Sequence, residues 1–476
     1  MTKKTDSVEK TASLPESDER LLKTLANLAA AQGARIFTVG GYVRDLLLGR
    51  TTVEIDFVVL GDGPALARAA RQRLNGKGFV VYPKFGTASF LIPDRKLEFV
   101  TARKETYSKQ SRNPVVEKSS LAEDLARRDF TVNAMALSLE PDSFGAIIDP
   151  FRGQKDLGKQ LIRTPLDPAQ TFSDDPLRMM RAARFAGQLQ FRIHEHTLSA
   201  MREQRERLKI VSQERITDEL IKILSHDQPS IGLRILLEAG LMSIILPELA
   251  DLVGVEQRDA YHHKDVFEHT LKVVDNVARV SDNLLLRFSA LMHDIGKPRV
   301  KRFVKDQGWT FHGHELVGVR MLRHIIPRLK LSREYLRYTT KLTRLHMRPI
   351  QLIGEEITDS AIRRLIVQAD QEMEDLMTLC RADITSGNPA RVRKHLENFD
   401  HVHARMKEVE EKDRMRAFQS PVRGDEIMAV CGLRPGPSVG RLKKIIEEAI
   451  LDGEIPNEHD AALDYLLRVK DRIINQ

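Results

Sequence analysis

The chain has 476 residues, a formal net charge of +8 and a sequence pI near 9.3. Its length exceeds what one hydrophobic core supports, so we expect several domains, and no apolar run is long enough to cross a bilayer. The only cysteines are Cys380 and Cys431, which excludes a disulfide framework and predicts a reducing, cytoplasmic compartment.

The first third of the chain reads as mixed α/β. Residues 1–18 lack the apolar centre of a signal peptide and are expected to form a disordered tail. A helical pattern in "RLLKTLANLAAAQG" precedes the strand "ARIFTVGG", a helix from "YVRDLLLG" and the strand "VEIDFVVL". Further strands are expected in "GFVVYP", "TASFLI" and "KLEFVTA". We therefore predict an α/β head domain over residues 19–150.

From about residue 165 onward nearly every segment has helical period, interrupted by Gly and Pro. We predict a helical neck over residues 151–255, a second domain over 256–415 and a C-terminal helical unit over 416–476. The stretch "RVRKHLENFDHVHARMKEVEEKDRMRAFQ" is polar nearly all round and is expected to bridge to that last unit.

Two carboxylates lie one residue apart in "VEIDFVVL". The period of a strand places Glu54 and Asp56 on one face and Ile55 and Phe57 on the other. Acids are poor strand formers, and neighbouring like charges repel. Carboxylate oxygens are the ligands that Mg²⁺ prefers, although such a pair taken alone is more typical of a solvated sheet edge.

The residues just upstream favour a metal site. Gly40 and Gly41 stand at a strand-to-helix junction, where bare backbone N–H groups can approach a phosphate. Arg44 follows in the first helical turn and can donate to phosphate oxygens. The glycine pair alone would be an ordinary tight turn. Together with the two acids, in one short βαβ-like unit, it indicates metal-assisted chemistry on a nucleoside triphosphate.

Three ordered blocks carry a resemblance to a known family. "VGGYVRDLLLGR" with "EIDFVV", then "EDLARRDFTVNAMAL", then "DDPLRMMRAARFAGQLQF" resemble the head of class II tRNA nucleotidyltransferases and bacterial poly(A) polymerases, in the polymerase-β-like superfamily. The resemblance covers roughly residues 34–230. It implies that Glu54 and Asp56 hold two Mg²⁺ ions. The family has Asp at both positions, and Glu54 is one methylene longer.

Three further polar residues belong to this head. Glu98 in "KLEFVTAR" is either a third acid that assists the attacking hydroxyl or a solvent-facing residue of an edge strand. The resemblance implies that Arg128 touches triphosphate or sugar. Its neighbour Asp129 is equally well explained as an internal ion-pair partner that orders the loop.

A stripe of polar residues recurs every three positions in "DDPLRMMRAARF": Asp175, Arg178, Arg181 and Arg184. A basic stripe is usually a solvated helix face, but a carboxylate with a guanidinium can match the edge of a nucleobase. The resemblance implies a protein template that selects CTP and then ATP. Asp175 and Arg178 would read the base, and Arg181 and Arg184 would help to hold the nucleotide.

The middle of the chain resembles the HD phosphohydrolase superfamily through "YHHKDVFEHTLKVVDN", "LMHDIGKP", "FHGHE", "LHMRP" and "CRADITSG". Its metal-ligand positions are matched by His269, His293, Asp294 and Asp383. Imidazole with carboxylate suits a transition metal better than Mg²⁺. His314 and His346 could add a second metal, although a lone histidine is more often a surface or core residue. Phosphomonoesters or 2′,3′-cyclic phosphates at RNA ends are implied by analogy, and a helical scaffold with a vestigial site is the alternative.

These observations predict template-independent addition or repair of the 3′-terminal CCA of tRNA from CTP and ATP. The tRNA would be gripped through shape and phosphates by "MREQRERLKI", by the basic segment 320–348 and by Arg441, Lys443 and Lys444. One alternative is a poly(A) polymerase or a sibling that adds only the C's or only the A. The segment between Arg103 and Glu123 is undeleted, whereas CC-only relatives have a shortened loop there. Another alternative is an HD phosphohydrolase whose head has become an inactive RNA-binding domain.

Overall fold

The computed structural model describes residues 12–474, apart from 109–110, 119, 260–261, 306–307, 353–358, 386–388, 417–419, 452–453 and 457. The chain divides into two compact units, Met1–His346 and Met347–Gln476, and each is described by itself. The division falls inside the range expected for the second domain. Most of the expected N-terminal tail lies outside the described residues, and helix α1 begins at Glu16.

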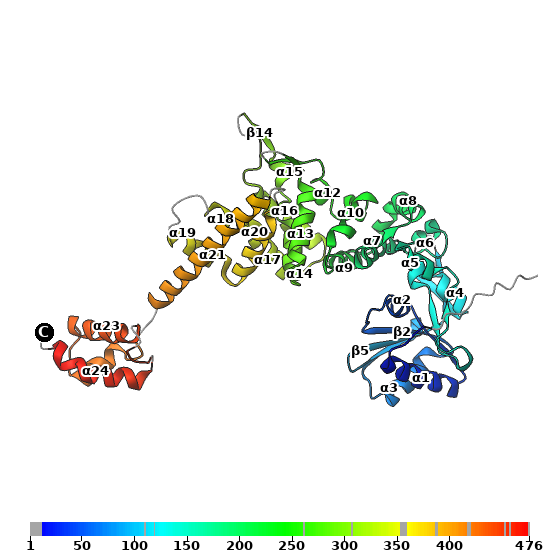
Figure 1. Ribbon diagram of the computed structural model, residues 1–476, viewed down its shortest axis with the longest axis horizontal. Coiled ribbons are helices and arrows are strands. Elements are labelled where there is room, and N and C mark those ends of the chain that lie inside the picture. The colour runs from blue at the N-terminus through cyan, green and yellow to red at the C-terminus, as the bar shows by residue number, and fades with distance from the viewer. Residues whose placement is uncertain are drawn as a thin grey trace, which may run out of the picture. The chain divides into compact units, whose positions relative to one another are not determined.

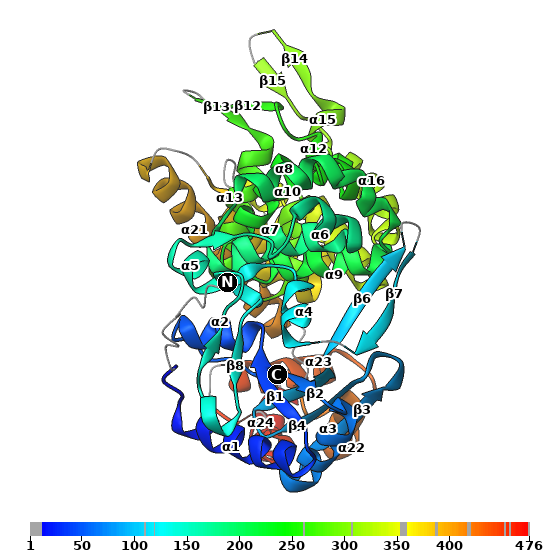
Figure 2. The ribbon, with the colours of Figure 1, turned by 90° about the vertical axis from the view of Figure 1, so that its right-hand side faces the viewer.

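A seven-stranded sheet forms the head, in the lower part of Figure 2. Its strands, in sheet order, are β3 Lys77–Tyr82, β4 Thr87–Ile92, β5 Arg95–Thr101, β2 Glu54–Leu60, β1 Arg35–Val39, β8 Ala136–Ser138 and β9 Ile147–Ile148. The expected strands of the first third are therefore confirmed.

The pairing of β1 with β2 corrects the expectation of a βαβ-like unit. The two strands are antiparallel, and Val39 at the end of β1 lies opposite Asp56. The helix between them, α2 Gly41–Leu47, has seven residues and rises only about 10 Å. A seven-residue strand such as β2 spans about 23 Å. Because α2 is too short to return along the sheet, the chain turns back beside β1.

Two helices cover one face of the sheet, α1 Glu16–Ala31 and α3 Gly63–Arg73 (Figure 1). Buried apolar side chains of the strands include Ile55, Phe57 and Phe99, and the Phe57 and Phe99 rings stack with centroids 4.8 Å apart. Strand alternation directs the residues between them to the opposite face. The acids of β2 and β5 therefore lie on the face that α1 and α3 leave open.

The segment expected to form the neck, residues 151–255, is mostly helical. Its elements are α5 Gly153–Gly158, β10 Leu161–Ile162, α6 Pro168–Asp174, α7 Leu177–Leu189, β11 Arg192–Ile193, α8 Glu195–Gln204, η4 Arg205–Ile210, α9 Gln213–Leu224, α10 Pro229–Glu238, α11 Met242–Ile245 and α12 Pro247–Ala250. The range expected for the head also contains α4 Leu121–Ala126 and η2 Thr131–Asn133. A β-hairpin precedes α4, β6 Arg103–Ser108 with β7 Ser111–Lys118. This hairpin occupies most of the segment between Arg103 and Glu123.

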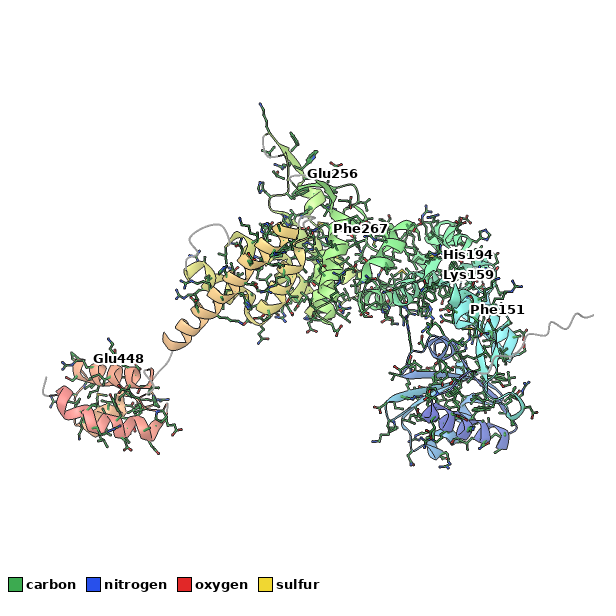
Figure 3. All side chains as sticks on the ribbon, viewed as in Figure 1. Phe151, Lys159, His194, Glu256, Phe267 and Glu448 are labelled. Atoms are coloured by element: carbon green, nitrogen blue, oxygen red, sulfur yellow. The ribbon has the colours of Figure 1, made fainter. Side chains whose placement is uncertain are left out.

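The rest of the first unit is a helical body with two short hairpins. Its helices are α13 Val266–Ala278, α14 Leu284–Met292, α15 Lys297–Val300, α16 His314–Arg328 and α17 Arg333–Leu345. Phe267 of α13 is 1% exposed and belongs to the core of this body (Figure 3). The hairpins, β12 Glu256–Asp259 with β13 His262–Asp265 and β14 Arg302–Val304 with β15 Gly308–Thr310, were not expected. They are too short to produce a recognisable alternation in the sequence.

The second unit is helical throughout its described residues. Its helices are α18 Arg348–Gln351, α19 Asp359–Ala369, α20 Met373–Asp383, α21 Pro389–Arg416, α22 Gly424–Cys431, α23 Pro437–Leu451 and α24 His459–Ile474. The expected polar connection coincides with α21. The last three helices bury an apolar core of their own around Ile427, Leu442 and Leu466. None of the described helices is long and apolar enough to cross a bilayer.

Candidate functional site

Three acids lie together on the open face of the head sheet. In the parallel pairing of β2 with β5, Asp56 stands opposite Glu98 and Glu54 opposite Lys96. The Lys96 Nζ atom lies 2.7 Å from Glu54 Oε1 and 3.5 Å from Glu98 Oε2. Lys96 therefore partly neutralises the two outer acids, and Asp56 lies deepest in the group.

The environment of Asp56 disfavours its charged form. Burial raises the pKa of Asp56 to about 6; Arg128 opposes this rise, whereas the charges of Glu98 and Glu54 add to it. A group of carboxylate oxygens with excess negative charge, in which Asp56 is desolvated, is the donor set that a hard divalent cation requires. The residues present thus fit the magnesium site that the sequence predicts.

Gly40 lets the backbone approach this group closely. It is the N-cap of α2 with φ 72° and ψ −131°, a conformation that L-residues other than glycine rarely adopt. A Cβ atom at Gly40 would lie 2.9 Å from Arg128 Nη1 and 3.6 Å from Asp56 Oδ2. At Gly41 the nearest such contact would be 3.6 Å, to Arg44 Nη2. Gly40 is therefore the glycine that the packing requires.

Arg44 is held firmly by the protein itself. Its side chain is 4% exposed, and Nη1 donates to Asn133 Oδ1 at 2.8 Å. Nε and Nη2 both donate to the Asp45 carboxylate. The predicted phosphate ligand thus lines the site, but its forked face is engaged by Asp45.

An ion pair joins the "RRDF" loop to α7. Asp129 Oδ2 accepts from Arg181 Nε at 2.8 Å and Nη2 at 2.6 Å, and Oδ1 accepts from Asn133 Nδ2 at 3.0 Å. Burial alone would raise the pKa of Asp129, but Arg181 and the Asn133 hydrogen bond outweigh it and lower the pKa to about 2. The structure therefore shows Asp129 in the internal ion pair that was offered for it.

The other polar residues of the stripe are also anchored. Asp175 is the C-cap that follows α6, and its Oδ1 accepts from the Leu177 backbone N–H at 3.2 Å. Arg178 donates to the Arg127 backbone carbonyl. Arg184 Nε donates to Glu219 Oε2 of α9 at 2.7 Å. These contacts fix the orientation of the stripe toward the head.

A single cleft of about 1300 Å³ brings the head residues together. All the residues predicted from the sequence for this site line it, namely Gly40, Gly41, Arg44, Glu54, Asp56, Glu98, Arg128, Asp175, Arg178, Arg181 and Arg184. Sequence reasoning missed other lining residues: Lys96, Arg127, Asn133, Phe185, Arg215 and Lys222. Lys96 could have been found, because it lies two residues before Glu98 on the same strand face. Arg215 and Lys222 come from α9 and enter only through the tertiary packing.

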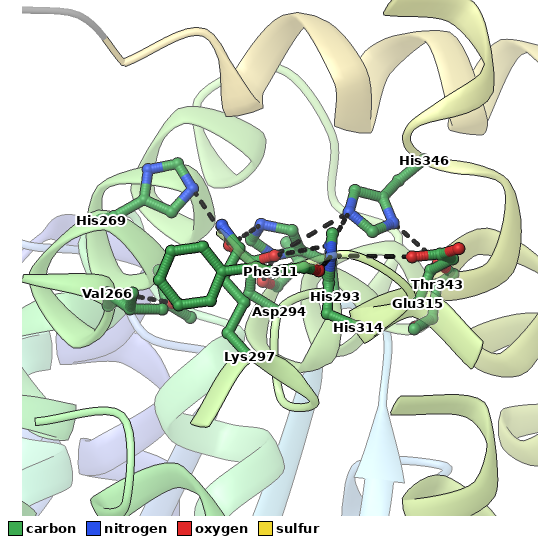
Figure 4. Close-up of polar contacts among 12 residues, drawn as sticks. Val266, His269, His293, Asp294, Lys297, Phe311, His314, Glu315, Thr343 and His346 are labelled. Atoms are coloured by element: carbon green, nitrogen blue, oxygen red, sulfur yellow. Dashed lines mark hydrogen bonds and ion pairs between the residues drawn. The ribbon is translucent and has the colours of Figure 1, made fainter. Parts of the chain in front are cut away.

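A second polar cluster lies in the helical body (Figure 4). His314 Nε2 lies 3.3 Å and His346 Nε2 3.8 Å from Asp294 Oδ1. His293 Nε2 lies 3.1 Å and His269 Nε2 3.4 Å from Asp294 Oδ2. All five side chains are buried, so the cluster gathers imidazoles around one carboxylate away from solvent.

The tautomers of these histidines leave their Nε2 atoms available to bind a cation. The Nδ1 atoms of His293, His314 and His346 lie 2.7–2.9 Å from backbone carbonyls, to which neutral imidazoles donate. The Nε2 atoms then present lone pairs, and those of His314 and His346 are only 3.2 Å apart. Two facing lone pairs repel unless they share a cation, so Asp294, His314 and His346 fit a metal ion. The sequence suggested these two histidines only as an option.

Two further residues bear on this cluster. Lys297 Nζ lies 2.6 Å from Asp294 Oδ2 and supplies a positive charge beside it. Burial would raise the pKa of Asp294, but His293 and Lys297 outweigh it and hold the pKa well below its usual range. The fourth predicted ligand, Asp383, is the last residue of α20 in the second unit.

Comparisons with known proteins match three parts of the chain to family models. Residues 36–163 match the poly A polymerase head domain, and residues 190–252 match the model described as the probable RNA and SrmB-binding site of polymerase A. Residues 266–384 match the HD domain.

Curated relatives extend over most of the chain. The A-adding tRNA nucleotidyltransferase of Deinococcus radiodurans is 32% identical over 89% of this chain and 93% of its own length. This chain belongs to the tRNA nucleotidyltransferase family. The CC-adding tRNA nucleotidyltransferase of Thermus thermophilus is also 32% identical, over 89% of this chain and 92% of the relative. The multifunctional CCA protein of Pseudomonas fluorescens is 34% identical, over 73% of this chain and 84% of the relative.

Solved structures of the family share the fold. The Thermotoga maritima CCA-adding enzyme complexed with tRNA has a TM-score of 0.59 and 22% identity, and the match covers 96% of each chain. A tRNA nucleotidyltransferase solved with a primer tRNA and an incoming ATP analogue has a TM-score of 0.57 and 25% identity, over 80% of this chain and 99% of that one. The α/β polymerase head followed by a helical remainder with an HD domain is thus confirmed.

Membership of the tRNA nucleotidyltransferase family settles the enzyme class. The protein is a nucleotidyltransferase of tRNA processing, and the predicted family and fold class are confirmed. A head of this kind and an HD domain both imply the use of divalent metal ions. The alternative of a hydrolase with an inactive head is disfavoured, because the head acids and the stripe of α7 line one continuous cleft.

Proposed function

We propose that this enzyme builds and repairs the 3′-terminal CCA of tRNA, adding C, C and A from CTP and ATP without a nucleic-acid template. The observation that carries the proposal is the cleft that the acids of β2 and β5 share with Asp175 and the arginines of α7. The acids of β2 and β5 suit phosphoryl chemistry, and the carboxylate and guanidinium groups of the stripe suit the recognition of a base. One cleft thus offers both functions.

In this proposal Glu54 and Asp56 hold Mg²⁺ in the head. The ions, when bound, stabilise negative charge on the attacking and leaving oxygens. Glu98, the register partner of Asp56, would accept the proton of the terminal ribose hydroxyl. Gly40, Gly41 and Arg128 would contact the triphosphate, while Arg44 orders the loop that carries Asn133.

The base would be selected by the protein. Asp175 offers a carboxylate acceptor and Arg178 a guanidinium donor, the two functions needed to distinguish the edges of cytosine and adenine. Arg181 and Arg184 are fixed by Asp129 and Glu219, so they would keep the reading face rigid and add positive potential for the phosphates. Anchored side chains of this kind discriminate better than mobile ones.

Partial activity is the second candidate, because the matches to the A-adding and CC-adding relatives extend over 89% of this chain. The deciding experiment uses tRNA transcripts that lack all three, the last two or only the last nucleotide of the CCA end. Each is incubated with CTP alone, ATP alone or both. With CTP and ATP together, we expect extension of every transcript to the full CCA end. Extension only of the transcript lacking the terminal A, or a stop after the C's, would establish partial activity instead.

Base selection is tested by Asp175→Ala and Arg178→Ala. Both variants should incorporate CTP and ATP less selectively, while their unfolding temperatures stay near that of the wild type. Arg192→Ala is the matched control, since Arg192 is an exposed arginine of β11 outside the cleft. Unchanged selectivity in both variants would contradict the protein template.

For the HD domain we propose that the Asp294 cluster binds a transition metal and hydrolyses phosphate esters at RNA 3′ ends. The support is its donor set of imidazole and carboxylate, with Asp383 as a further ligand implied by the family resemblance. The whole enzyme would act in the cytoplasm, where its two free cysteines stay reduced.

A further inference from the structure

The β14–β15 hairpin projects from the helical body of the first unit (Figures 1 and 2). Its two strands are antiparallel, and Phe303 lies directly opposite Trp309. Directly opposed residues of a hairpin share one face. The ring centroids are 5.4 Å apart at an interplanar angle of 77°. The two rings therefore form one aromatic surface.

This aromatic surface is open to solvent. Phe303 is 65% and Trp309 38% exposed. A two-stranded hairpin gains little stability from apolar groups that remain in water. Two large exposed rings side by side are therefore better explained by a ligand than by folding.

Positive charge surrounds the two rings. Lys301 Nζ lies 4.4 Å from the centre of the Trp309 ring, a cation–π contact. The side chains of Arg302 and Lys305 are exposed on the same hairpin. In the sequence from Lys297 to Gly313, five basic residues stand against one acid, Asp306. The ligand should therefore carry negative charge together with flat apolar faces.

We propose that the β14–β15 hairpin is a stacking platform for unpaired bases of single-stranded RNA. Bases would stack on Phe303 and Trp309, and backbone phosphates would pair with Lys301 and Lys305. A duplex conceals the faces of its bases and would meet only the charges. An acidic protein segment would use the lysines but leaves the paired rings unexplained.

The platform is attached at both ends to the Asp294 cluster. Lys297, which contacts Asp294, lies four residues before Lys301. Phe311 follows Trp309 by two residues; its backbone carbonyl lies 2.9 Å from His314 Nδ1, and its ring centre lies 5.6 Å from Lys297 Nζ. An RNA strand stacked on the hairpin would thus be held beside the cluster. That last step rests on the proposed hydrolytic function, whereas the stacking itself does not.

The chain offers a local reporter, because Trp309 is its only tryptophan. The intact enzyme is titrated with a short unstructured oligoribonucleotide while tryptophan emission is recorded. We expect saturable quenching of Trp309. The same sequence as a duplex, and inorganic polyphosphate, should cause little change. Equal responses to all three probes would show a purely electrostatic surface and overturn the proposal.

Variants separate stacking from charge. Phe303→Leu retains an apolar side chain and the reporter but removes one ring, so the dissociation constant should rise on the order of tenfold. Val304→Ala is the matched control, because Val304 is the exposed apolar residue that follows Phe303 in the sequence. This substitution should leave the affinity for the oligoribonucleotide unchanged. Lys301→Ala should reduce the slope of log affinity against log salt by about 0.7. Identical affinities for Phe303→Leu and Val304→Ala would overturn the proposal.

The platform is distinguished from nucleotide addition by Asp56→Ala. This variant loses a ligand of the head site and should still show the full quenching of Trp309. If quenching persists but neither the wild type nor any variant adds CCA, the proposed function is wrong and the stacking platform is supported. An absence of quenching in an enzyme that adds CCA refutes the platform alone.

Discussion

Half-buried Asp56 and buried Asp129 line the same cleft, yet their pKa values move in opposite directions. Burial raises the pKa of Asp56 to about 6 because the nearby acids add to the desolvation. For Asp129 the paired Arg181 and the Asn133 amide outweigh burial and lower the pKa to about 2. Asp56 thus favours the binding of a cation, whereas Asp129 already has Arg181 as its counter-charge.

Asp56→Asn should stabilise the metal-free protein at neutral pH. The pKa of Asp56 is raised from 3.8 to about 6, so folding favours its protonated form. The destabilisation caused by the carboxylate is therefore absent below about pH 4, grows between pH 4 and 6, and is complete above pH 6. The variant should gain at most roughly 3 kcal/mol there and should lose nucleotide addition on the order of a thousandfold.

The measurement is thermal unfolding of both proteins from acid to neutral pH in the presence of a chelator. Added Mg²⁺ should raise the unfolding temperature of the wild type and leave that of Asp56→Asn nearly unchanged. A variant that is less stable than the wild type at every pH would contradict the electrostatic account of Asp56.

Asp129→Asn should have the opposite effect on stability. The native pKa lies below the ordinary 3.8, so the carboxylate stabilises the fold above that value, and this contribution is lost as the pH falls through about 2. Leaving Arg181 without its partner should cost about 3 kcal/mol at neutral pH. Chemical denaturation gives the difference, with Arg215→Ala as a control on an exposed arginine of the same cleft. Equal losses in both variants would mean that the Asp129 pair has no special role.

At the scale of elements, the turn from β1 into α2 sets the distance between the "RRDF" loop and the acids of β2. Gly40 adopts a positive φ, and the space of its missing side chain is taken by the Arg128 guanidinium. The Arg128 side chain is also bound to Asp124 of α4, at 3.1 Å. Strand β2, helix α2 and the "RRDF" loop thus meet where no additional carbon fits.

Gly40→Ala should therefore impair the enzyme far more than Gly41→Ala. Positive φ and a 2.9 Å contact to Arg128 Nη1 combine to cost roughly 1–3 kcal/mol at Gly40. At Gly41 the nearest new contact is 3.6 Å, an ordinary van der Waals distance. Unfolding temperature and the rate of CTP addition, measured on both variants, test this difference. Comparable losses would show that the loop accommodates a side chain by moving.

At the scale of the whole molecule, the first unit contains two sites with different donor chemistry. The head offers carboxylate oxygens, which suit a hard cation, and the helical body offers imidazoles around Asp294, which suit a transition metal. Different segments of the chain supply the two donor sets. The two sites should therefore respond independently to mutation and to chelators.

Replacing His314 and His346 together by Gln should remove the bound transition metal. Mass spectrometry of the intact protein, with elemental analysis, should show the loss, and any metal-dependent phosphatase activity should disappear. Nucleotide addition should remain within about twofold of the wild type, because the head donors are untouched. A loss of addition comparable to that of Asp56→Ala would show that the two sites are coupled.

The sequence by itself determined the strands of the head, the same-face acids and the ordered blocks of the family, because these depend on short-range periodicity and spacing. The direction of β1 against β2 followed from the length of α2, which the sequence did not reveal. Tertiary packing decided the hairpins of the helical body and the residues that α9 contributes to the cleft. Arg215 and Lys222 line the cleft because α9 packs beside it. Asp129 pairs with Arg181 because the "RRDF" loop meets α7, which lies far from it in the sequence. Local sequence patterns determine which face of a strand or helix is apolar. The burial of those apolar faces against one another determines which charged side chains come into contact.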